Sequence, residues 1–222
     1  MTTLGLFVKY PAAGRVKTRL AAELGADQAA ALYATFVAAL TDRFRRTADA
    51  RVLCYSPATD EAREYFAAIA GSEFALWPQP EADLGARMAQ FFAEHLRQPE
   101  DRAVIIGSDS PTLPLAYVGQ AFELLRDADC VIGPATDGGY YLIGQRGFSR
   151  PIFDGVAWST SRVLDQTVAL VRKARARLAL LPPWYDVDTP DDWRMLIGHL
   201  RALQWAGEMP PERALARLLA MD

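Results

Sequence analysis

The residues best able to do chemistry in this chain of 222 residues lie in three short segments, each just past an apolar run. The first, Gly14-Arg15-Val16-Lys17-Thr18-Arg19, is rich in cations. The second is Gly107-Ser108-Asp109-Ser110-Pro111, and the third is Asp186-Val187-Asp188-Thr189-Pro190. A basic loop and separated aspartates are what a metal-dependent enzyme acting on a nucleoside di- or triphosphate requires.

The basic loop is suited to hold a polyphosphate. Gly14 and the small residues before it allow close approach of the backbone, and Arg15, Lys17 and Arg19 place three cations within five residues. The loop is not a P-loop, because Val16 stands where a P-loop has glycine, and a single glycine does not make a dinucleotide fingerprint. A solvated basic turn is the alternative interpretation.

Both acidic segments could supply ligands to a hard cation. Asp109 follows an apolar strand, where a cation could bridge its carboxylate to phosphate oxygens. Asp186 and Asp188 alternate about Val187, so in an extended segment both face the same way, and one could bind metal while the other orients it. For both segments the alternative is a role in capping the helix that follows.

A glycine turn, Thr136-Asp137-Gly138-Gly139-Tyr140-Tyr141, carries one acidic side chain. The Asp-Gly pair is typical of a turn between two antiparallel strands, and that interpretation needs no functional role. The functional alternative is that Asp137, Gly138 and Tyr140 bind an acceptor.

Two further segments each start a helix. Ser159 or Thr160 as N-cap is the plain explanation of Trp158-Ser159-Thr160-Ser161-Arg162. Arg162 in the first turn opposes the helix dipole, which favours a position facing an anionic substrate group. Arg87, at the start of another helix, is either an ordinary surface residue or a ligand of the nucleotide.

Apolar runs alternate with amphipathic stretches, which predicts an α/β fold with a mainly parallel sheet in one domain, 1–222. Strands are expected at Leu4–Val8, Arg51–Tyr55, Phe74–Trp77, Ala103–Ile106, Cys130–Gly133, Tyr140–Ile143 and Leu178–Leu181. Helices are expected at Ala26–Arg46, Glu61–Ala70, Leu84–Leu96, Leu115–Leu125 and Thr160–Arg175, from Pro190 to about Leu203, and after Pro211. Because ligands bind at the carboxyl ends of strands in open α/β sheets, the three segments should meet at one rim.

Composition excludes several classes of protein. A net charge of -3 argues against a nucleic-acid partner, and no apolar run approaches the roughly 20 residues that span a bilayer. The N-terminus lacks the charged region of a signal peptide, so a cytoplasmic location is expected. Cys54 and Cys130 are expected to be buried free thiols, and no zinc spacing or nucleophile–histidine–acid arrangement is found.

Taken together, these segments resemble the GT-A-type nucleotidyltransferase superfamily. Nearly the whole chain is similar to a bacterial family named "glycosyltransferase" or "radical-SAM/selenodomain-associated transferase". The resemblance is carried by Phe7-Val8-Lys9-Tyr10-Pro11, Gly14–Leu20, Asp83–Met88, Gly107–Pro111, Asp137–Tyr141 and Trp158-Ser159-Thr160. The Lys-Thr-Arg-Leu loop is also similar to that of 2-phospho-lactate guanylyltransferase. Asp-Val-Asp-Thr-Pro resembles the second metal-site segment of molybdenum-cofactor and sugar nucleotidyltransferases.

The resemblance implies a three-layer α/β/α sandwich with a mixed, mainly parallel sheet, as in nucleotide-diphospho-sugar transferases. It implies that Gly14, Arg15 and Lys17 hold the nucleotide phosphates and that Asp109 and Asp188 bind a metal. The chain departs from the pattern in two places. A second glycine of the nucleotidyltransferase loop is missing, and the Asp-X-Asp of sugar transferases is reduced to Ser108-Asp109-Ser110.

The sequence therefore predicts a transferase that depends on Mg²⁺, or Mn²⁺ in its place, and uses a nucleoside triphosphate or nucleotide-sugar. Nucleotidyl transfer to a small acceptor bearing phosphate or carboxylate is favoured. Glycosyl transfer from a nucleotide-diphospho-sugar and non-catalytic nucleotide binding are the alternatives. The expected catalytic residues are Lys17 and Asp109, and the expected metal ligands are Asp109 and Asp188. The nucleotide is expected to contact Gly14, Arg15, Lys17, Arg19 and Arg87. The acceptor is expected to contact Asp137, Gly138, Tyr140, Trp158 and Arg162. The base, the sugar, the acceptor, the oligomeric state and the choice between Asp186 and Asp188 stay open.

Overall fold

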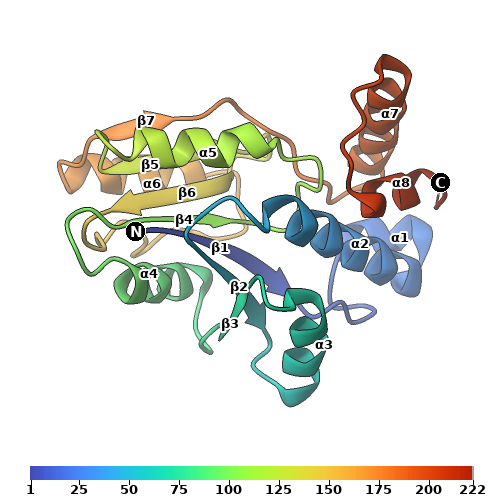
Figure 1. Ribbon diagram of the computed structural model, residues 1–222, viewed down its shortest axis with the longest axis horizontal. Helices are drawn as coiled ribbons and strands as arrows, with labels where there is room; N and C mark the ends of the chain where they lie inside the picture. Colours follow the sequence, from blue (N-terminus) through green and yellow to red (C-terminus); the bar gives the residue numbers. More distant parts are fainter. Residues whose placement is uncertain (222) are drawn as a thin grey trace.

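A computed structural model describes residues 1–221, in which a seven-stranded sheet has the order β3-β2-β1-β4-β6-β5-β7 (Figure 1). The strands are β1 (Thr2–Lys9), β2 (Ala50–Ser56), β3 (Ala75–Pro78), β4 (Arg102–Ile106), β5 (Cys130–Pro134), β6 (Tyr140–Arg146) and β7 (Leu178–Leu180). Among the strands of residues 1–221, only β6 runs against the others, since it pairs antiparallel with both β4 and β5. The mixed, mainly parallel sheet expected from the sequence is confirmed.

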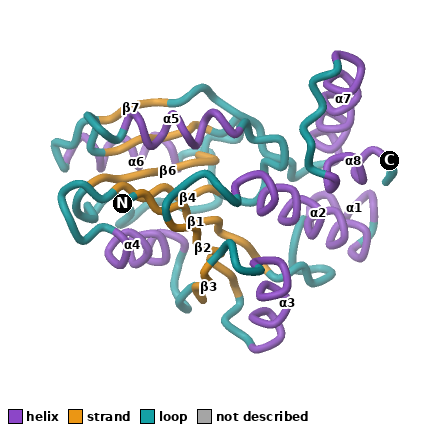
Figure 2. Tube along the Cα trace, viewed as in Figure 1, coloured by secondary structure: helices purple, strands orange, loops and turns teal. Residues whose placement is uncertain are grey.

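Helices cover both faces of this sheet and make three layers (Figure 2). The helices are α1 (Thr18–Leu24), α2 (Ala26–Phe44), α3 (Asp60–Ala70), α4 (Leu84–His95), α5 (Leu115–Leu124), α6 (Val163–Lys173), α7 (Pro190–Ala206) and α8 (Arg213–Leu219). Helices α2, α3 and α5 share one hydrophobic core with the sheet, and α7 and α8 extend that core around α2. Helices α4 and α6 pack on the opposite face. None of the helices in residues 1–221 is long and apolar enough to cross a membrane.

Alternation along β1 divides its side chains between the two cores. Leu4 and Leu6 are fully buried under the α2 layer, whereas Phe7 faces the α4 layer. Gly5 also faces α4, and a Cβ atom there would lie 2.5 Å from the ring of Phe91. Each large apolar side chain buried in this way stabilises the fold by about 1.5–3 kcal/mol. The apolar pattern therefore fixes which face of the strand each helix covers.

The parallel strands bring the three chemistry-bearing segments to one edge. The loops after β1, β4 and β7 all leave the sheet at its carboxyl edge, and the reversed β6 places the β5–β6 turn there as well. The backbone N–H of Val187 donates to the carbonyl of Asp109 at 2.9 Å, which joins the loops after β4 and β7 directly. The expected convergence of these loops on one rim is confirmed.

The start of α7 has the caps that the sequence predicts. The hydroxyl of Thr189 accepts from the backbone N–H of Asp192, and the Asp192 carboxylate accepts from the backbone N–H of Thr189, which makes a capping box with Pro190 in the first turn.

Two other helix starts differ from expectation. The basic loop runs directly into α1, a helix of seven residues with no side-chain cap, which the sequence analysis treated as loop. Helix α6 begins at Val163 rather than Thr160, and its N-cap is Arg162. The Thr160 hydroxyl instead donates to the carbonyl of Ala157 at 2.7 Å, so the Ser-Thr signal marks a turn before the helix.

A buried ion pair ties the C-terminal segment to the sheet domain. Arg43 of α2 donates to both carboxylate oxygens of Glu212, at 3.1 and 2.9 Å, and to the carbonyl of Leu113 at 2.8 Å. Both side chains are less than a tenth exposed. Because Leu113 lies in the loop after β4, this pair links α2, the approach to α8 and the loop that carries Asp109.

Replacing Glu212 with Gln should destabilise the fold by about 3–5 kcal/mol, because it leaves a buried guanidinium without its counter-charge. Burial alone raises the pKa of Glu212, but the hydrogen bonds and charge of Arg43 lower it overall. The stabilisation should therefore be present above the ordinary carboxyl range and be lost as pH falls through the folded-state pKa. Urea unfolding as a function of pH measures this, with the exposed Glu208→Gln as control. Equal losses in both variants would contradict the prediction.

Candidate active site

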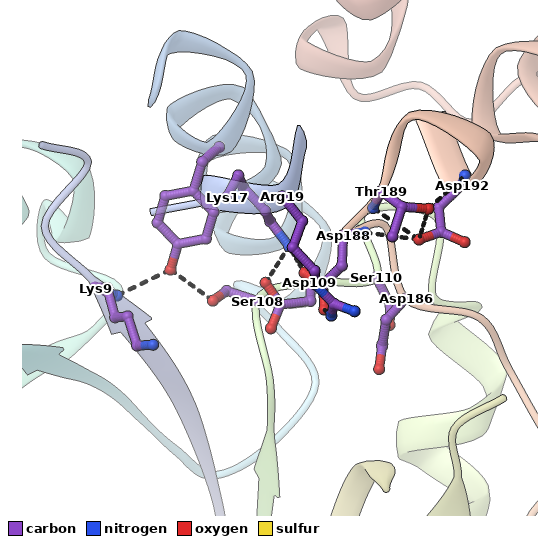
Figure 3. A network of polar contacts seen from close by, with 11 residues as sticks. Lys9, Lys17, Arg19, Ser108, Asp109, Ser110, Asp186, Asp188, Thr189 and Asp192 are labelled. Carbon is purple, nitrogen blue, oxygen red and sulfur yellow. Dashed lines mark hydrogen bonds and ion pairs between the residues drawn. The ribbon is translucent and has the colours of Figure 1, made fainter. Parts of the chain in front are cut away.

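Lys17 lies at the centre of the carboxyl edge (Figure 3). It ends the loop after β1 in the left-handed backbone conformation, with φ at 49°, and its side chain is only 3% exposed. Its ammonium Nζ forms ion pairs with Asp109 Oδ1 and, at 2.8 Å, with Asp188 Oδ1. One buried cation thus joins the two carboxylates that the sequence singled out as metal ligands.

Helix α2 supplies an aromatic floor beneath this ammonium. Lys17 Nζ lies 5.8 Å from the ring centre of Tyr33 and 5.6 Å from that of Phe36, distances at which a ring face attracts a cation. The Tyr33 hydroxyl accepts from the backbone N–H of Lys9 at 2.9 Å and shares a 2.7 Å hydrogen bond with the Ser108 hydroxyl. Tyr33 therefore connects the end of β1 to the loop that carries Asp109.

The two carboxylates keep Lys17 charged. Burial by itself lowers the pKa of Lys17, but attraction and hydrogen bonds from Asp109 and Asp188 raise it above its ordinary value. An uncharged lysine would leave both carboxylates without this partner. The ion pair is consequently held throughout the physiological pH range.

Asp188 is held from three sides. Its Oδ2 accepts from Arg19 at 3.0 Å, and its backbone N–H donates to the capping carboxylate of Asp192 at 3.1 Å. Burial raises the pKa of Asp188, but Lys17 and Arg19 outweigh this and lower it overall. Asp188 is therefore a carboxylate anion whose position is set by the start of α7.

Asp186 has the opposite electrostatic environment. It accepts a hydrogen bond from the Ser110 hydroxyl and faces no cation that pairs with it in the described residues. Burial raises the pKa of Asp186 to about 7, and the charges of Asp109, Asp137 and Asp188 act in the same direction. Two aspartates separated by a single residue thus differ strongly in acidity.

A polar cavity of about 230 Å³ opens beside these groups. It is lined by Arg19, Thr136, Asp137, Asp186, Asp188, Thr189 and Asp192. Its walls come from the starts of α1 and α7, the β5–β6 turn and the loop after β7. A larger, mainly apolar hollow of about 470 Å³ lies between the end of α5 and β7 and includes none of these residues.

The β5–β6 turn brings Asp137 to the cavity. The backbone N–H of Gly139 donates to Asp137 Oδ1 at 2.8 Å, which orients the carboxylate. Gly138 has a φ of +92°, and a Cβ atom there would lie 2.4 Å from the carbonyl oxygen of Ser161. The expected turn between antiparallel strands is confirmed, and its close approach to the segment before α6 explains the glycine.

Three of the predicted acceptor ligands lie elsewhere in the fold, and Gly138 of the β5–β6 turn is likewise absent from the cavity lining. Tyr140 packs in the α4–α6 core with its hydroxyl buried beside Thr167, and burial raises its pKa. Trp158 covers the start of α4, where a Cβ at Gly85 would lie 2.7 Å from the indole ring. Arg162 is exposed at the start of α6. Their predicted contact with an acceptor stays a prediction.

Arg87 reaches the neighbouring part of the same edge. Its guanidinium donates to the carbonyl of Ala82 at 2.7 Å and to the side chain of Gln79 at 3.3 Å, so it ties the loop after β3 to α4. Gly14, with φ at +73°, and Arg15 are exposed in the loop before Lys17. All three remain candidates for the nucleotide.

No site role was predicted from the sequence for Tyr33, Ser110 or Asp192. Tyr33 belongs to the apolar stripe of α2, so its periodicity suggests core packing alone. Asp192 did carry a signal, because Thr-x-x-Asp is the spacing of a capping box that reaches back to the residue after Asp188. Ser110 lies within one of the predicted segments. Its hydrogen bond to Asp186 could not be predicted, because it joins residues from different loops.

The donors present fit a hard cation shared with a substrate. Among residues 1–221 no group of three or more His, Cys, Asp or Glu side chains is arranged to hold a metal by itself. Asp109 and Asp188 nevertheless converge on one point, now taken by the Lys17 ammonium. Mg²⁺ typically binds one or two carboxylates and completes its shell with water and substrate phosphates. The arrangement suits that mode rather than an all-protein cage.

The model of a bacterial protein family, described as "Uncharacterized protein conserved in bacteria (DUF2064)", matches residues 39–160, more than half of the chain. The chain belongs to the DUF2064 family. No curated protein matches it.

Solved structures place this DUF2064 protein among transferase folds. An inferred nucleotide-diphospho-sugar transferase from Desulfovibrio desulfuricans G20 is 37% identical, with a TM-score of 0.86, over 99% of this chain and 96% of that one. A nucleotidyl transferase from Methanothermobacter thermautotroptrophicus is 15% identical, with a TM-score of 0.58, over 91% and 99% of the two chains. A 4-diphosphocytidyl-2C-methyl-D-erythritol synthase is 15% identical, with a TM-score of 0.53, over 88% and 96%. The last two show a shared fold alone.

Replacing Asp186 with Asn should stabilise the metal-free protein at alkaline pH, because it removes a carboxylate that burial and neighbouring charges disfavour. The raised pKa means that wild-type stability is full below the ordinary pKa of 3.8 and declines as pH rises through about 7. Thermal unfolding in chelator measures this, with a shift of about 2–4 °C for each kcal/mol. Identical pH dependence in the variant and the wild type would contradict it.

Replacing Gly138 with Ala should destabilise the site more than the same change at Gly155. Both glycines have positive φ, but a Cβ at Gly155 meets nothing within 4 Å, so that variant isolates the backbone strain. The clash with Ser161 should add about 1–3 kcal/mol at Gly138. Chemical denaturation of both variants tests this, and equal losses would show that the turn has room to move.

Proposed function

We propose that this DUF2064 protein is a Mg²⁺-dependent transferase that acts on a nucleoside triphosphate or a nucleotide-sugar, with nucleotidyl transfer favoured. The observation that carries the proposal is the meeting of Lys17, Asp109 and Asp188 at the carboxyl edge, where open α/β sheets bind ligands. Arg19 adds a second cation at the same point. Cations that can hold phosphates thus lie directly against carboxylates that can hold a metal.

Asp109 and Asp188 would hold Mg²⁺, or Mn²⁺ in its place. The ion would supply charge neutralisation to the phosphate oxygens when bound. Tyr33 and Asp192 position the two carboxylates, the first through Ser108 and the second through the backbone of Asp188.

The phosphates would be bound by Lys17, Arg15, Arg19 and the backbone around Gly14. In nucleotidyl transfer an acceptor oxygen attacks the α-phosphorus, the bond to the β-phosphate oxygen breaks, and pyrophosphate leaves. Lys17 and Arg19 would offset the charge that develops on the leaving phosphates. Positioning and electrostatics carry most of such a reaction, so no histidine is required.

The cavity beside Asp186 would bind the acceptor. Its lining holds four carboxylates and one guanidinium, from Arg19. Carboxylates accept hydrogen bonds from hydroxyl groups and repel anions, so the lining suits a hydroxyl-bearing acceptor better than the phosphate- or carboxylate-bearing one expected from the sequence. Asp137 and Asp186 would orient that hydroxyl, and one of these carboxylates would take its proton as the new bond to phosphorus forms.

Glycosyl transfer is the second candidate, and the Desulfovibrio protein, 37% identical along the full chain, favours it by its description. In that reaction the acceptor attacks the anomeric carbon and a nucleoside diphosphate leaves. The same cations and metal ligands would serve the diphosphate. Identification of the released product separates the two, because pyrophosphate marks nucleotidyl transfer.

Replacing Asp109 with Asn should weaken binding of Mg²⁺-nucleotide at least about tenfold, since one of two anionic metal ligands is lost. Isothermal titration with nucleoside triphosphates and nucleotide-sugars measures the affinity, and pyrophosphate or nucleoside diphosphate release measures turnover. The exposed Asp154→Asn is the matched control. Unchanged affinity in Asp109→Asn would refute the assignment, and binding without turnover over a broad acceptor panel would favour a non-catalytic nucleotide-binding protein.

A further inference from the structure

The proposed metal ligands already have cations of their own. Asp109 pairs with Lys17, and Asp188 pairs with both Lys17 and Arg19 (Figure 3). A divalent ion that reached the same oxygens would lie against the Lys17 ammonium. At such short range two cations repel strongly, the more so where one of them is shielded from water.

Lys17 cannot easily turn away to make room. Its side chain is almost fully buried, its backbone is fixed where the loop enters α1, and the rings of Tyr33 and Phe36 hold its ammonium from below. If Lys17 left this position without a new anionic partner, it would lose its ion pairs with Asp109 and Asp188. The side chain therefore needs a new negative partner before it moves.

The phosphates of a nucleotide are such a partner. They would arrive along the exposed side chains of Arg15 and Arg19, of which Arg19 already pairs with Asp188. The phosphate oxygens could accept hydrogen bonds from Lys17 and Arg19. At the same time the metal carried by the nucleotide would reach the carboxylates of Asp109 and Asp188. The metal would offset part of the negative charge that the phosphates bring, and Lys17 would stay in the site with a new partner.

We infer that Lys17 acts as an internal cation that occupies the metal position until a nucleotide arrives, so that the ligand of this site is a metal–nucleoside polyphosphate complex taken up as one unit. This inference rests on the proposed function. Free divalent cation binds poorly to the wild-type protein, and metal and nucleotide each increase the affinity for the other by the same factor. Lys17 thus couples the two ligands.

Variants of Lys17 should change the affinities for nucleotide and for free divalent cation in opposite directions. Replacing it with Gln should weaken nucleotide binding, yet should create affinity for a free divalent cation, because Asp109 loses its counter-charge and Asp188 keeps only Arg19. Most changes at a binding site remove affinity for every ligand, so a gain for one and a loss for the other identifies an exchange of cations.

The experiment measures Mn²⁺ binding to nucleotide-free protein by the loss of the free Mn²⁺ signal in electron paramagnetic resonance. Lys17→Gln should bind Mn²⁺ at least about fivefold more tightly than the wild type, the lower end of usual coupling between sites. Lys9→Gln removes one positive charge from the same edge but from a lysine outside these ion pairs, and should behave as the wild type. Adding Asp109→Asn to Lys17→Gln should abolish the gain.

Equal or weaker Mn²⁺ binding in Lys17→Gln would overturn the inference, whereas the proposed function fails if the wild type does not bind the Mn²⁺-nucleotide complex. Circular dichroism establishes that the variants are folded. If Lys17→Gln does not fold, Lys17→Met keeps the buried stem of the side chain and takes its place, with the same gain expected and the same result against it.

Discussion

The site depends on one buried ammonium placed between two carboxylates. Lys17 ties the loop after β1 to the loops after β4 and β7, which are 92 and 171 residues away along the chain. Removing one partner of a fully buried pair costs about 3–5 kcal/mol, and the cost here is smaller because Asp109 and Asp188 are 47% and 32% exposed. The surrounding loops and helices bring these three charges together and shield the Lys17 ammonium from water.

The supports of this ion pair come from all parts of the fold. Helix α2 provides the ring of Tyr33 below the ammonium and, through Arg43, holds the loop after β4 against the C-terminal segment. The capping box of α7 fixes the backbone of Asp188. Asp186, only two residues earlier, pairs with no cation among residues 1–221, and burial raises its pKa. Pairing with Lys17 thus separates Asp188, whose pKa is lowered, from Asp186, whose pKa is raised.

Much of this arrangement could be predicted from the sequence, because it follows from local rules. Apolar runs alternating with helical periodicity gave the layered sheet, and the direction of parallel strands placed Asp109 and Asp188 at one edge. The pairing of Lys17 with both carboxylates could not be predicted, since it depends on loop conformations that no periodicity encodes. Tyr33 was hidden in an apolar stripe, and the hydroxyl signal before α6 marked a turn instead of a cap.

Glycosyl and nucleotidyl transfer would use different donors, but both require the same cation exchange, in which Lys17 leaves the metal position for a phosphate. The most direct test is a crystal structure of the protein with Mn²⁺ and a nucleoside triphosphate, in which anomalous scattering locates the metal. We expect an anomalous peak between Asp109 and Asp188, with the Lys17 ammonium moved onto a phosphate oxygen. A peak elsewhere, or Lys17 still bridging both carboxylates in the bound complex, would contradict it.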